Sequence, residues 1–145
     1  MKRLILLPGL LAALSSPAFA EVKTSSDIGF SVFHKAEVEA TPEEVWARLV
    51  APKLWWSKNH SWSKSVEGFS IDARAGGCFC EAIQEKGADG KVKTVGTVEH
   101  MRVIYAHPGH ALRMQGALGP LQSEAVLGTL TVLLDKAKDG TGTTL

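Results

Sequence analysis

The chain has 145 residues, of which 45% are hydrophobic and 21% are charged, and its formal net charge at pH 7 is +1. This composition is typical of one soluble globular domain, and it excludes a disordered tail, a fibrous repeat and a protein with several membrane spans. Because the charges almost balance, no basic field would gather phosphates, and we expect no nucleic-acid partner. Two cysteines are too few for a disulfide-rich scaffold or a four-thiolate zinc site.

The first twenty residues have the composition and order of a secretory signal peptide. Lys2-Arg3 forms a positive start, Leu4–Leu14 an apolar run, and Ala18-Phe19-Ala20 matches the small-residue cleavage pattern. The apolar run is shorter than the ~20 residues that a membrane-spanning helix needs. We therefore expect export to the periplasm or the medium, cleavage after Ala20, and no stable membrane anchor afterwards.

The clearest local signal along the remaining chain is a helix start. Residues 21–28 are polar and are expected to form an irregular lead-in to a domain over residues 29–145, whose first strand covers residues 29–39. Thr41-Pro42-Glu43-Glu44 then combines an N-cap hydroxyl, a proline at the first helical position and a glutamate at the third, which is a capping box. Pro52 ends this helix and begins a second short one that extends to Trp56.

A β-meander is expected beyond Gly68, because turn residues recur every 8–15 residues with no helical pattern between them. The expected strands cover residues 69–73, 78–84, 92–105, 110–118, 126–136 and 141–145. The predicted fold class is therefore α+β, with a curved antiparallel sheet and a capped helix pair after the first strand. One helix pair covers little of such a sheet, and the chain ends within a strand. We expect a missing closing strand and C-terminal helix; the alternative is a small sheet whose open face binds a partner.

Several segments together resemble the SRPBCC superfamily, also called START-like or helix-grip. The resemblance spans residues 29–145. The segment Val38–Trp46 is similar to the family's first strand running into its first helix. The other matching segments are Pro52–Trp56, Gly76–Glu81, Pro108–Arg113, Gly119–Leu121 and Gly142–Leu145. The most similar branch is named after activators of the ninety-kilodalton heat-shock chaperone's ATPase. The resemblance implies a deep apolar cavity between the sheet and a long C-terminal helix, which this sequence lacks.

Cys78 and Cys80 lie two residues apart on an expected strand, so their side chains face the same way. Their Cα atoms would be about 6.6–7 Å apart in an extended strand, which is at the outer edge of disulfide geometry. We therefore expect no disulfide between them unless Gly76-Gly77 distorts the strand. Two small apolar thiols in a cavity wall are the favoured interpretation.

Five histidines raise the question of a metal site, but their spacing does not support one. No His-Glu-x-x-His or Cys-x-x-Cys pattern joins them, so we expect solvated turn histidines and neither a metal nor a cofactor. The histidines are His34, His60, His100, His107 and His110.

Aromatic residues gather on either side of a polar stretch, residues 57–61. Trp46 and Trp55 are interpreted as core residues, whereas an aromatic wall with a few polar tips suits a pocket for an apolar ligand. Arg113 is expected on the surface, with an inward orientation toward a ligand carboxylate as the alternative, because sequence does not fix which strand parity faces inward. The candidate ligand-binding residues are Trp56, Trp62, Phe69, Cys78, Cys80, His100 and Arg113.

Three functions remain open at this stage. The first is a binding module that holds a small hydrophobic molecule in the cavity. The second is an enzyme, since relatives of the fold include polyketide cyclases and aromatases, with His100 or Glu99 as acid or base. The third is the chaperone-activator role that the branch name suggests, which the expected export opposes. No Ser-His-Asp order, nucleophile elbow or phosphate-binding loop occurs, and binding is therefore preferred.

Overall fold

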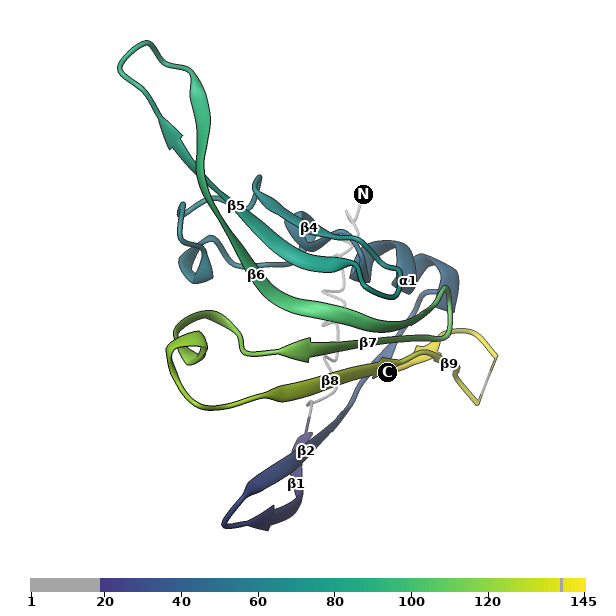
Figure 1. Ribbon diagram of the computed structural model, residues 1–145. Coiled ribbons are helices and arrows are strands. Elements are labelled where there is room, and N and C mark those ends of the chain that lie inside the picture. The colour runs from purple at the N-terminus through teal and green to yellow at the C-terminus, as the bar shows by residue number, and fades with distance from the viewer. Residues whose placement is uncertain (1–18, 139) are drawn as a thin grey trace, which may run out of the picture. The chain divides into compact units, whose positions relative to one another are not determined.

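The computed structural model describes residues 19–138 and 140–145. The chain separates into two units that divide between Ala36 and Glu37, and each is described by itself. Figure 1 follows the chain from the first described strand to the C-terminus. No helix in these described ranges is long and apolar enough to cross a membrane.

The first unit contains an antiparallel hairpin of β1 (Phe19–Ser26) and β2 (Gly29–Lys35). The expectation of an irregular lead-in over residues 21–28 is therefore wrong. Val22 pairs with Val32, and the hydroxyls of Thr24 and Ser31 lie 2.8 Å apart across the strands, so the β-branched Val22 and Thr24 support a strand within this mostly polar segment. The predicted signal peptide lies outside the described residues except for Phe19 and Ala20, which begin β1. Export and cleavage stay predictions.

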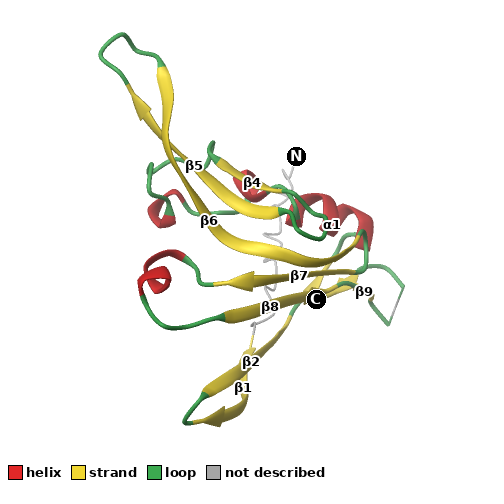
Figure 2. Cartoon of the chain, viewed as in Figure 1, coloured by secondary structure: helices red, strands yellow, loops and turns green. Residues whose placement is uncertain are grey.

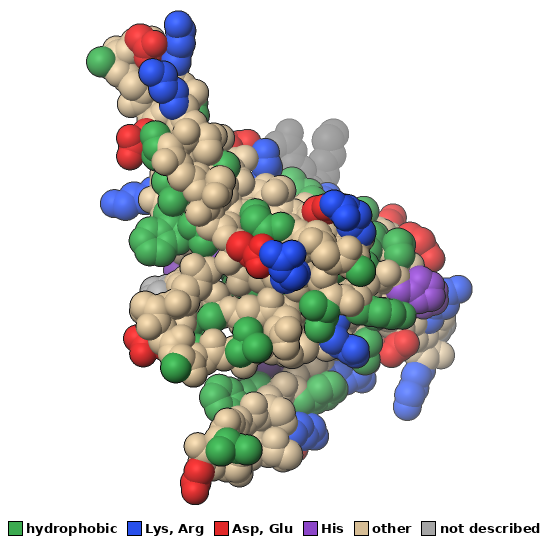
Figure 3. All heavy atoms as spheres, in the orientation of Figure 1, with side chains coloured by type: hydrophobic (Ala, Val, Ile, Leu, Met, Phe, Trp, Pro, Cys, Tyr) green, Lys and Arg blue, Asp and Glu red, His purple; other side chains and the backbone are tan. Residues whose placement is uncertain are grey.

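The second unit, residues 37–145, is built on one five-stranded antiparallel sheet with the order β4-β5-β6-β7-β8. With one α-helix among the described residues of this unit, the sheet confirms the α+β class (Figure 2). The strands are β4 (Phe69–Ile71), β5 (Cys78–Lys86), β6 (Val92–His107), β7 (Ala111–Gly116) and β8 (Gly128–Leu133). Turns form at the expected glycines, and Gly76, Gly90 and Gly109 have the positive φ that a side chain disfavours. At the tip of the β5–β6 hairpin, charged side chains of both signs gather (Figure 3).

A second, small sheet joins the two ends of this unit in the order β3-β10-β9. The strand expected over residues 29–39 is interrupted at Ala36, and its last part is β3 (Glu37–Val38). β3 pairs with β10 (Thr143–Thr144), which also pairs with β9 (Asp135–Lys136). The buried Thr143 hydroxyl donates a hydrogen bond of 2.6 Å to the Ala40 carbonyl, so the C-terminal strand also fixes the approach to the helix.

The helix α1 (Pro42–Leu49) begins as the capping box predicts. Thr41 Oγ1 accepts from the Glu44 amide, and a Glu44 carboxylate oxygen accepts from the Thr41 amide at 2.9 Å. The second helix predicted to extend to Trp56 is shorter: it is a single 3₁₀ turn, η1 (Pro52–Leu54). Two further 3₁₀ turns, η2 (Lys58–His60) and η3 (Gly119–Ser123), were not predicted, because neither has the length that hydrophobic periodicity requires.

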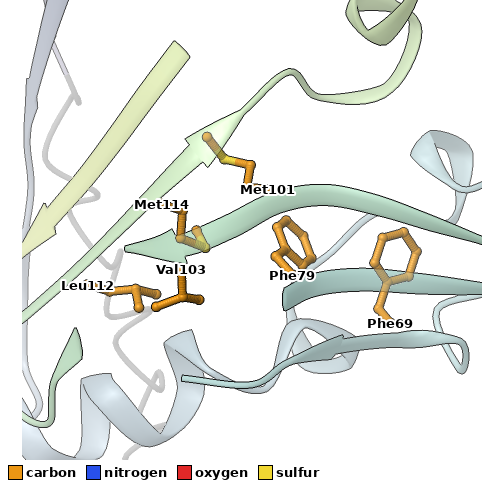
Figure 4. Close-up of a cluster of buried hydrophobic side chains, with 6 residues drawn as sticks. All are labelled: Phe69, Phe79, Met101, Val103, Leu112 and Met114. Atoms are coloured by element: carbon orange, nitrogen blue, oxygen red, sulfur yellow. The ribbon is translucent and has the colours of Figure 1, made fainter. Parts of the chain in front are cut away.

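The hydrophobic core lies on one face of the five-stranded sheet, which we call the inner face. Figure 4 shows its six buried side chains grouped along neighbouring strands. Trp46 and Leu49 of α1 and Trp56 after η1 pack against this cluster, so the helical segment covers part of the inner face. The six residues are Phe69, Phe79, Met101, Val103, Leu112 and Met114.

A β-bulge in β6 reverses the side-chain parity of that strand. Phe79 pairs with Met101 but Cys80 pairs with Glu99, which leaves His100 without a partner in the ladder. The consecutive residues His100 and Met101 are both buried as a result. Because one extra residue moves every following side chain to the other face, the inward set of β6 could not be predicted from alternation alone.

Candidate functional site

A pocket of about 500 Å³ opens at one end of the inner face. The loop between η1 and β4 forms one wall, the start of η3 forms another, and His100 of β6 contributes from the sheet. The indoles of Trp56 and Trp62 and the side chain of Leu118 make much of this lining apolar. The lining residues are Trp56, Asn59, His60, Ser61, Trp62, His100, Leu118 and Gly119.

Next to this pocket lies a buried pair formed by Glu81 and His100. The side chains are 0% and 2% exposed, and Nε2 of His100 lies 3.3 Å from Oε2 of Glu81. Glu81 follows Phe79 by two residues on β5 and therefore shares its inward orientation. His100 reaches the same place because the bulge turns it inward. A charged residue is rarely buried this deeply unless it is paired, so the contact accounts for the burial of Glu81.

Serines of the loop after η2 complete the surroundings of the Glu81 carboxylate. Ser61 Oγ lies 2.7 Å from Oε1 of Glu81, and the amide of Ser63 donates to the same oxygen at 3.2 Å. Ser63 Oγ also accepts from the Gln84 amide at 2.8 Å. Lys64, which has φ 52°, closes the turn that brings these serines together. The carboxylate thus connects the pocket wall of residues 59–62 to the sheet.

Aromatic rings enclose the imidazole of His100. The Phe69 ring stacks on it with a centroid distance of 5.3 Å and an interplanar angle of 12°. The Phe79 ring lies 5.3 Å away and the Trp56 indole 6.1 Å away. Trp56 is itself held by a 2.8 Å hydrogen bond from its Nε1 to the His60 carbonyl. These contacts pack aromatic rings around the imidazole of His100.

One nitrogen of His100 has no partner. Nδ1 is buried and makes no hydrogen bond to any residue in the described part of the chain. A carboxylate only accepts, so Nε2 carries the proton that faces Glu81 and Nδ1 of a neutral ring is an acceptor. Leaving a buried acceptor unpaired costs about 1–3 kcal/mol, which an incoming donor would recover. The unpaired nitrogen thus belongs to a ring that lines the pocket.

The backbone near His100 is held from the other side by β7 and η3. Gly116 ends β7, and a Cβ there would lie 2.8 Å from the His100 carbonyl oxygen, so only glycine permits this approach. Gln122 of η3 donates from its side chain to the Glu99 carbonyl at 2.8 Å. The η3 wall of the pocket is thus attached directly to the bulge.

Four of the predicted site residues lie at or beside the pocket. Trp56, Trp62 and His100 line it, and Phe69 stacks behind His100. The expectation that the histidines are solvated is wrong for His100, which the bulge buries. His107 and His110 do lie at a turn, with ring centroids 4.4 Å apart. Within residues 19–138 and 140–145, no group of three or more His, Cys, Asp or Glu is arranged to hold a metal ion.

Glu99 and Arg113 lie on the outer face of the sheet, away from the pocket. Glu99, the alternative acid or base, is exposed, forms a 2.7 Å ion pair with Arg102 and does not line the pocket. Arg113 is exposed, donates to Thr131 Oγ1 at 2.9 Å and lies over the Tyr105 ring. The expected surface position of Arg113 is correct, and the alternative inward orientation is wrong because Leu112 and Met114 occupy the inner face.

The expectation for the two cysteines is wrong. Cys78 and Cys80 form a disulfide, with Cα atoms 5.4 Å apart instead of the 6.6–7 Å expected for an extended strand. The strand is contracted at Phe79, next to the bulge, which the argument from an ideal strand could not include. The two cysteines pair in register with Arg102 and Glu99 and so share the outer face, not the cavity wall.

Sequence reasoning missed Glu81, Ser61 and Ser63. A usable signal existed for Glu81, since it shares strand parity with Phe79, and an aromatic residue beside a turn is a good candidate for the inner face. The serines gave no such signal, because Ser61–Ser65 reads as an ordinary polar loop until its carboxylate partner is known.

Comparison with known proteins establishes the fold alone. No protein-family model matches the sequence, and no curated protein matches it significantly. A solved structure of a protein from Mycobacterium smegmatis is similar, with a TM-score of 0.52 and 18% identity, over 88% of this chain and 75% of that one. A protein from Rhodobacter sphaeroides matches with a TM-score of 0.50 and 21% identity, over 86% of this chain and 74% of that one.

Proposed function

We propose that this domain binds a small, largely apolar molecule in the pocket beside His100. The observation that carries the proposal is the combination of an aromatic-walled pocket of about 500 Å³ with one buried, unpaired nitrogen next to it. Ligand sites are commonly apolar hollows with a few fixed polar groups, and volumes of several hundred Å³ suit small organic molecules. Such a ligand would be held mainly by desolvation of the two indoles.

The finer fold that we propose is the helix-grip arrangement expected from the sequence. It is supported by the packing of Trp46 and Leu49 of α1 against the inner face of a curved antiparallel sheet. In that arrangement the pocket lies where the sheet and the helical segment diverge. The position of the pocket between the residues after η1 and the central strand β6 agrees with this proposal.

The binding test uses an uncharged fluorescent apolar probe, N-phenylnaphthylamine, titrated into the full chain. We expect saturable binding with enhanced probe fluorescence. Trp62→Ala should weaken it about tenfold, because contact with an indole that is 59% exposed buries roughly 50–100 Å² of apolar surface. Tyr105→Ala is the matched control, since it removes a half-exposed ring on the outer face. Equal loss in both variants, or no saturable binding, would overturn the proposal.

Native mass spectrometry of the purified protein supplies a second test without a chosen probe. A mass excess that is lost on denaturation would identify a bound small molecule and give its size. Retention of that excess in Tyr105→Ala and its loss in Trp62→Ala would assign it to the pocket. An excess that is unaffected by Trp62→Ala would assign the molecule to another site.

The Glu81–His100 pair favours one second candidate, an enzyme that moves a proton at His100. A carboxylate hydrogen-bonded to one imidazole nitrogen orients the ring and stabilises the imidazolium that forms when the other nitrogen accepts a proton. His100→Ala distinguishes the two functions once a ligand is known. Lost turnover with retained binding supports the enzyme, whereas an unchanged product profile leaves binding as the function.

A further inference from the structure

The Cys78–Cys80 disulfide has no role in the binding function proposed above. It joins two residues separated only by Phe79. A disulfide that closes a longer loop restricts the unfolded chain more, and a loop of this length restricts it little. Its effect is therefore expected to be local, on the shape of β5 and its neighbour.

The disulfide lies on β5 directly opposite the β6 bulge that buries His100. The Cα atoms of Cys78 and Cys80 are 5.4 Å apart, so β5 advances less at Phe79 than an extended strand would. At the same level β6 fits one extra residue, His100, between the partners of Phe79 and Cys80. One step of β5, from Phe79 to Cys80, therefore faces two steps of β6, from Met101 to Glu99, and the disulfide spans that step of β5.

Two residues next to the disulfide connect it to the pocket. Cys80 is followed by Glu81, whose carboxylate meets His100 and the Ser61–Ser63 turn. Phe79, between the cysteines, packs against the His100 ring at 5.3 Å. An extension of β5 at Phe79 would shift both groups relative to β6 and withdraw support from the buried orientation of His100.

We propose that Cys78–Cys80 is a reversible oxidation site that exchanges with low-molecular-weight thiols, and that its oxidised form keeps His100 at the pocket. In the forward step a thiolate attacks one Sγ, the sulfur–sulfur bond breaks, and its electron pair leaves on the other Sγ, which takes a proton. A second thiolate attacks the mixed disulfide and releases the first cysteine. Two small thiols are oxidised to one disulfide while the protein gains two electrons and two protons.

The first experiment measures the redox state and His100 together in the folded protein. The chain is equilibrated in glutathione buffers of stepped ratio, and thiols are counted by alkylation and mass. The His100 ring resonances, assigned by their loss in His100→Gln, are followed in parallel. We expect full reduction within the glutathione range while the protein stays folded, with the His100 signals moving at the same midpoint.

The double variant Cys78→Ser/Cys80→Ser is the control. It should show the reduced-type His100 signals at every glutathione ratio. If it does not fold, the titration of the unmodified chain decides alone. A disulfide that is reduced only when the protein unfolds, or reduction that leaves the His100 signals unchanged, would overturn the proposal.

The effect on ligand affinity rests on the proposed function and is measured separately. Reduction should weaken N-phenylnaphthylamine binding about tenfold in the unmodified chain and change nothing in the double variant. If the oxidised protein does not bind the probe, the proposed function fails, while the His100 signals still decide the redox proposal. If the oxidised protein binds and reduction has no effect on affinity, the redox proposal fails and the binding function stands.

Discussion

The inner face of the sheet has two ends that differ in the side chains they bury and in what covers them. At one end Val103, Leu112 and Met114 are buried in an apolar cluster that α1 covers. At the other end the inward positions hold Glu81 and His100, and a pocket opens beside them. The covered end has the properties of a core, whereas the open end combines incomplete packing with a buried polar pair. We therefore expect the covered end to contribute most to stability, and the open end is where we propose that a ligand binds.

The contrast depends on local irregularities more than on residue type. β6 runs through both ends, and its side chains change parity at the bulge between Glu99 and Met101. Without that extra residue, either His100 or Val103 would face outward. Bulges are common beside functional sites for this reason, since they redirect a side chain without ending the strand.

The largest effect is expected at the covered end. Leu112→Ala removes a side chain that is fully buried, and we expect a loss of about 2–5 kcal/mol in the free energy of unfolding. Chemical denaturation followed by circular dichroism measures it. A loss below 1 kcal/mol would mean that this cluster is not the stabilising core.

A smaller loss is expected for Glu81→Gln at the open end. The amide keeps the shape of the carboxyl group but cannot accept on both sides, so the contacts with His100 and Ser63 are weakened at a cost of about 1–3 kcal/mol. Amide hydrogen exchange should accelerate at Ser63 and not at Leu112. Uniform acceleration along the chain would contradict a local role for this carboxylate.

Trp62→Ala should separate recognition from stability. Because this indole is largely exposed, we expect a change in unfolding free energy of less than about 0.5 kcal/mol, together with the tenfold weaker probe binding described above. A large loss of stability in this variant would show that the open end is part of the core, and the contrast between the two ends would fail.

The smallest effect on stability is expected at the N-terminal cap of α1, the helix that packs on the covered end. Hydrogen bonds from the Thr41 amide and hydroxyl hold the pKa of Glu44 below its usual value of 4.5. The folded state therefore favours the ionised form, so this contribution is present above pH 4.5 and is lost as the pH falls below it. Glu44→Gln removes the dependence.

Thermal melts of the two proteins measure this effect. The difference in melting temperature between the unmodified chain and Glu44→Gln should be constant above about pH 5 and should shrink below pH 4.5. A difference that stays constant down to pH 3 would show that the capping carboxylate does not couple to folding.

Elements that depend on short-range sequence patterns could be predicted from the sequence, whereas the candidate site could be predicted only in part. The capping box of α1 and the glycine turns of the meander follow from short-range chemistry and were predicted correctly. The pocket tryptophans were predicted because aromatic residues flank a polar loop. Glu81 was missed although its strand parity with Phe79 was readable, whereas the disulfide and the inward position of His100 depend on the local shape of β5 and β6 at the bulge. The register between β5 and β6 joins residues about 20 positions apart, so a short stretch of sequence does not reveal it.

The most direct test of the pocket is a map of amide chemical shifts on addition of N-phenylnaphthylamine to the isotope-labelled full chain. We expect the largest shifts at Trp56, Trp62, His100 and Leu118, which surround the pocket. Shifts centred on the exposed apolar residues of β2, such as Phe30 and Val32, or on Arg113 of the outer face, would contradict it.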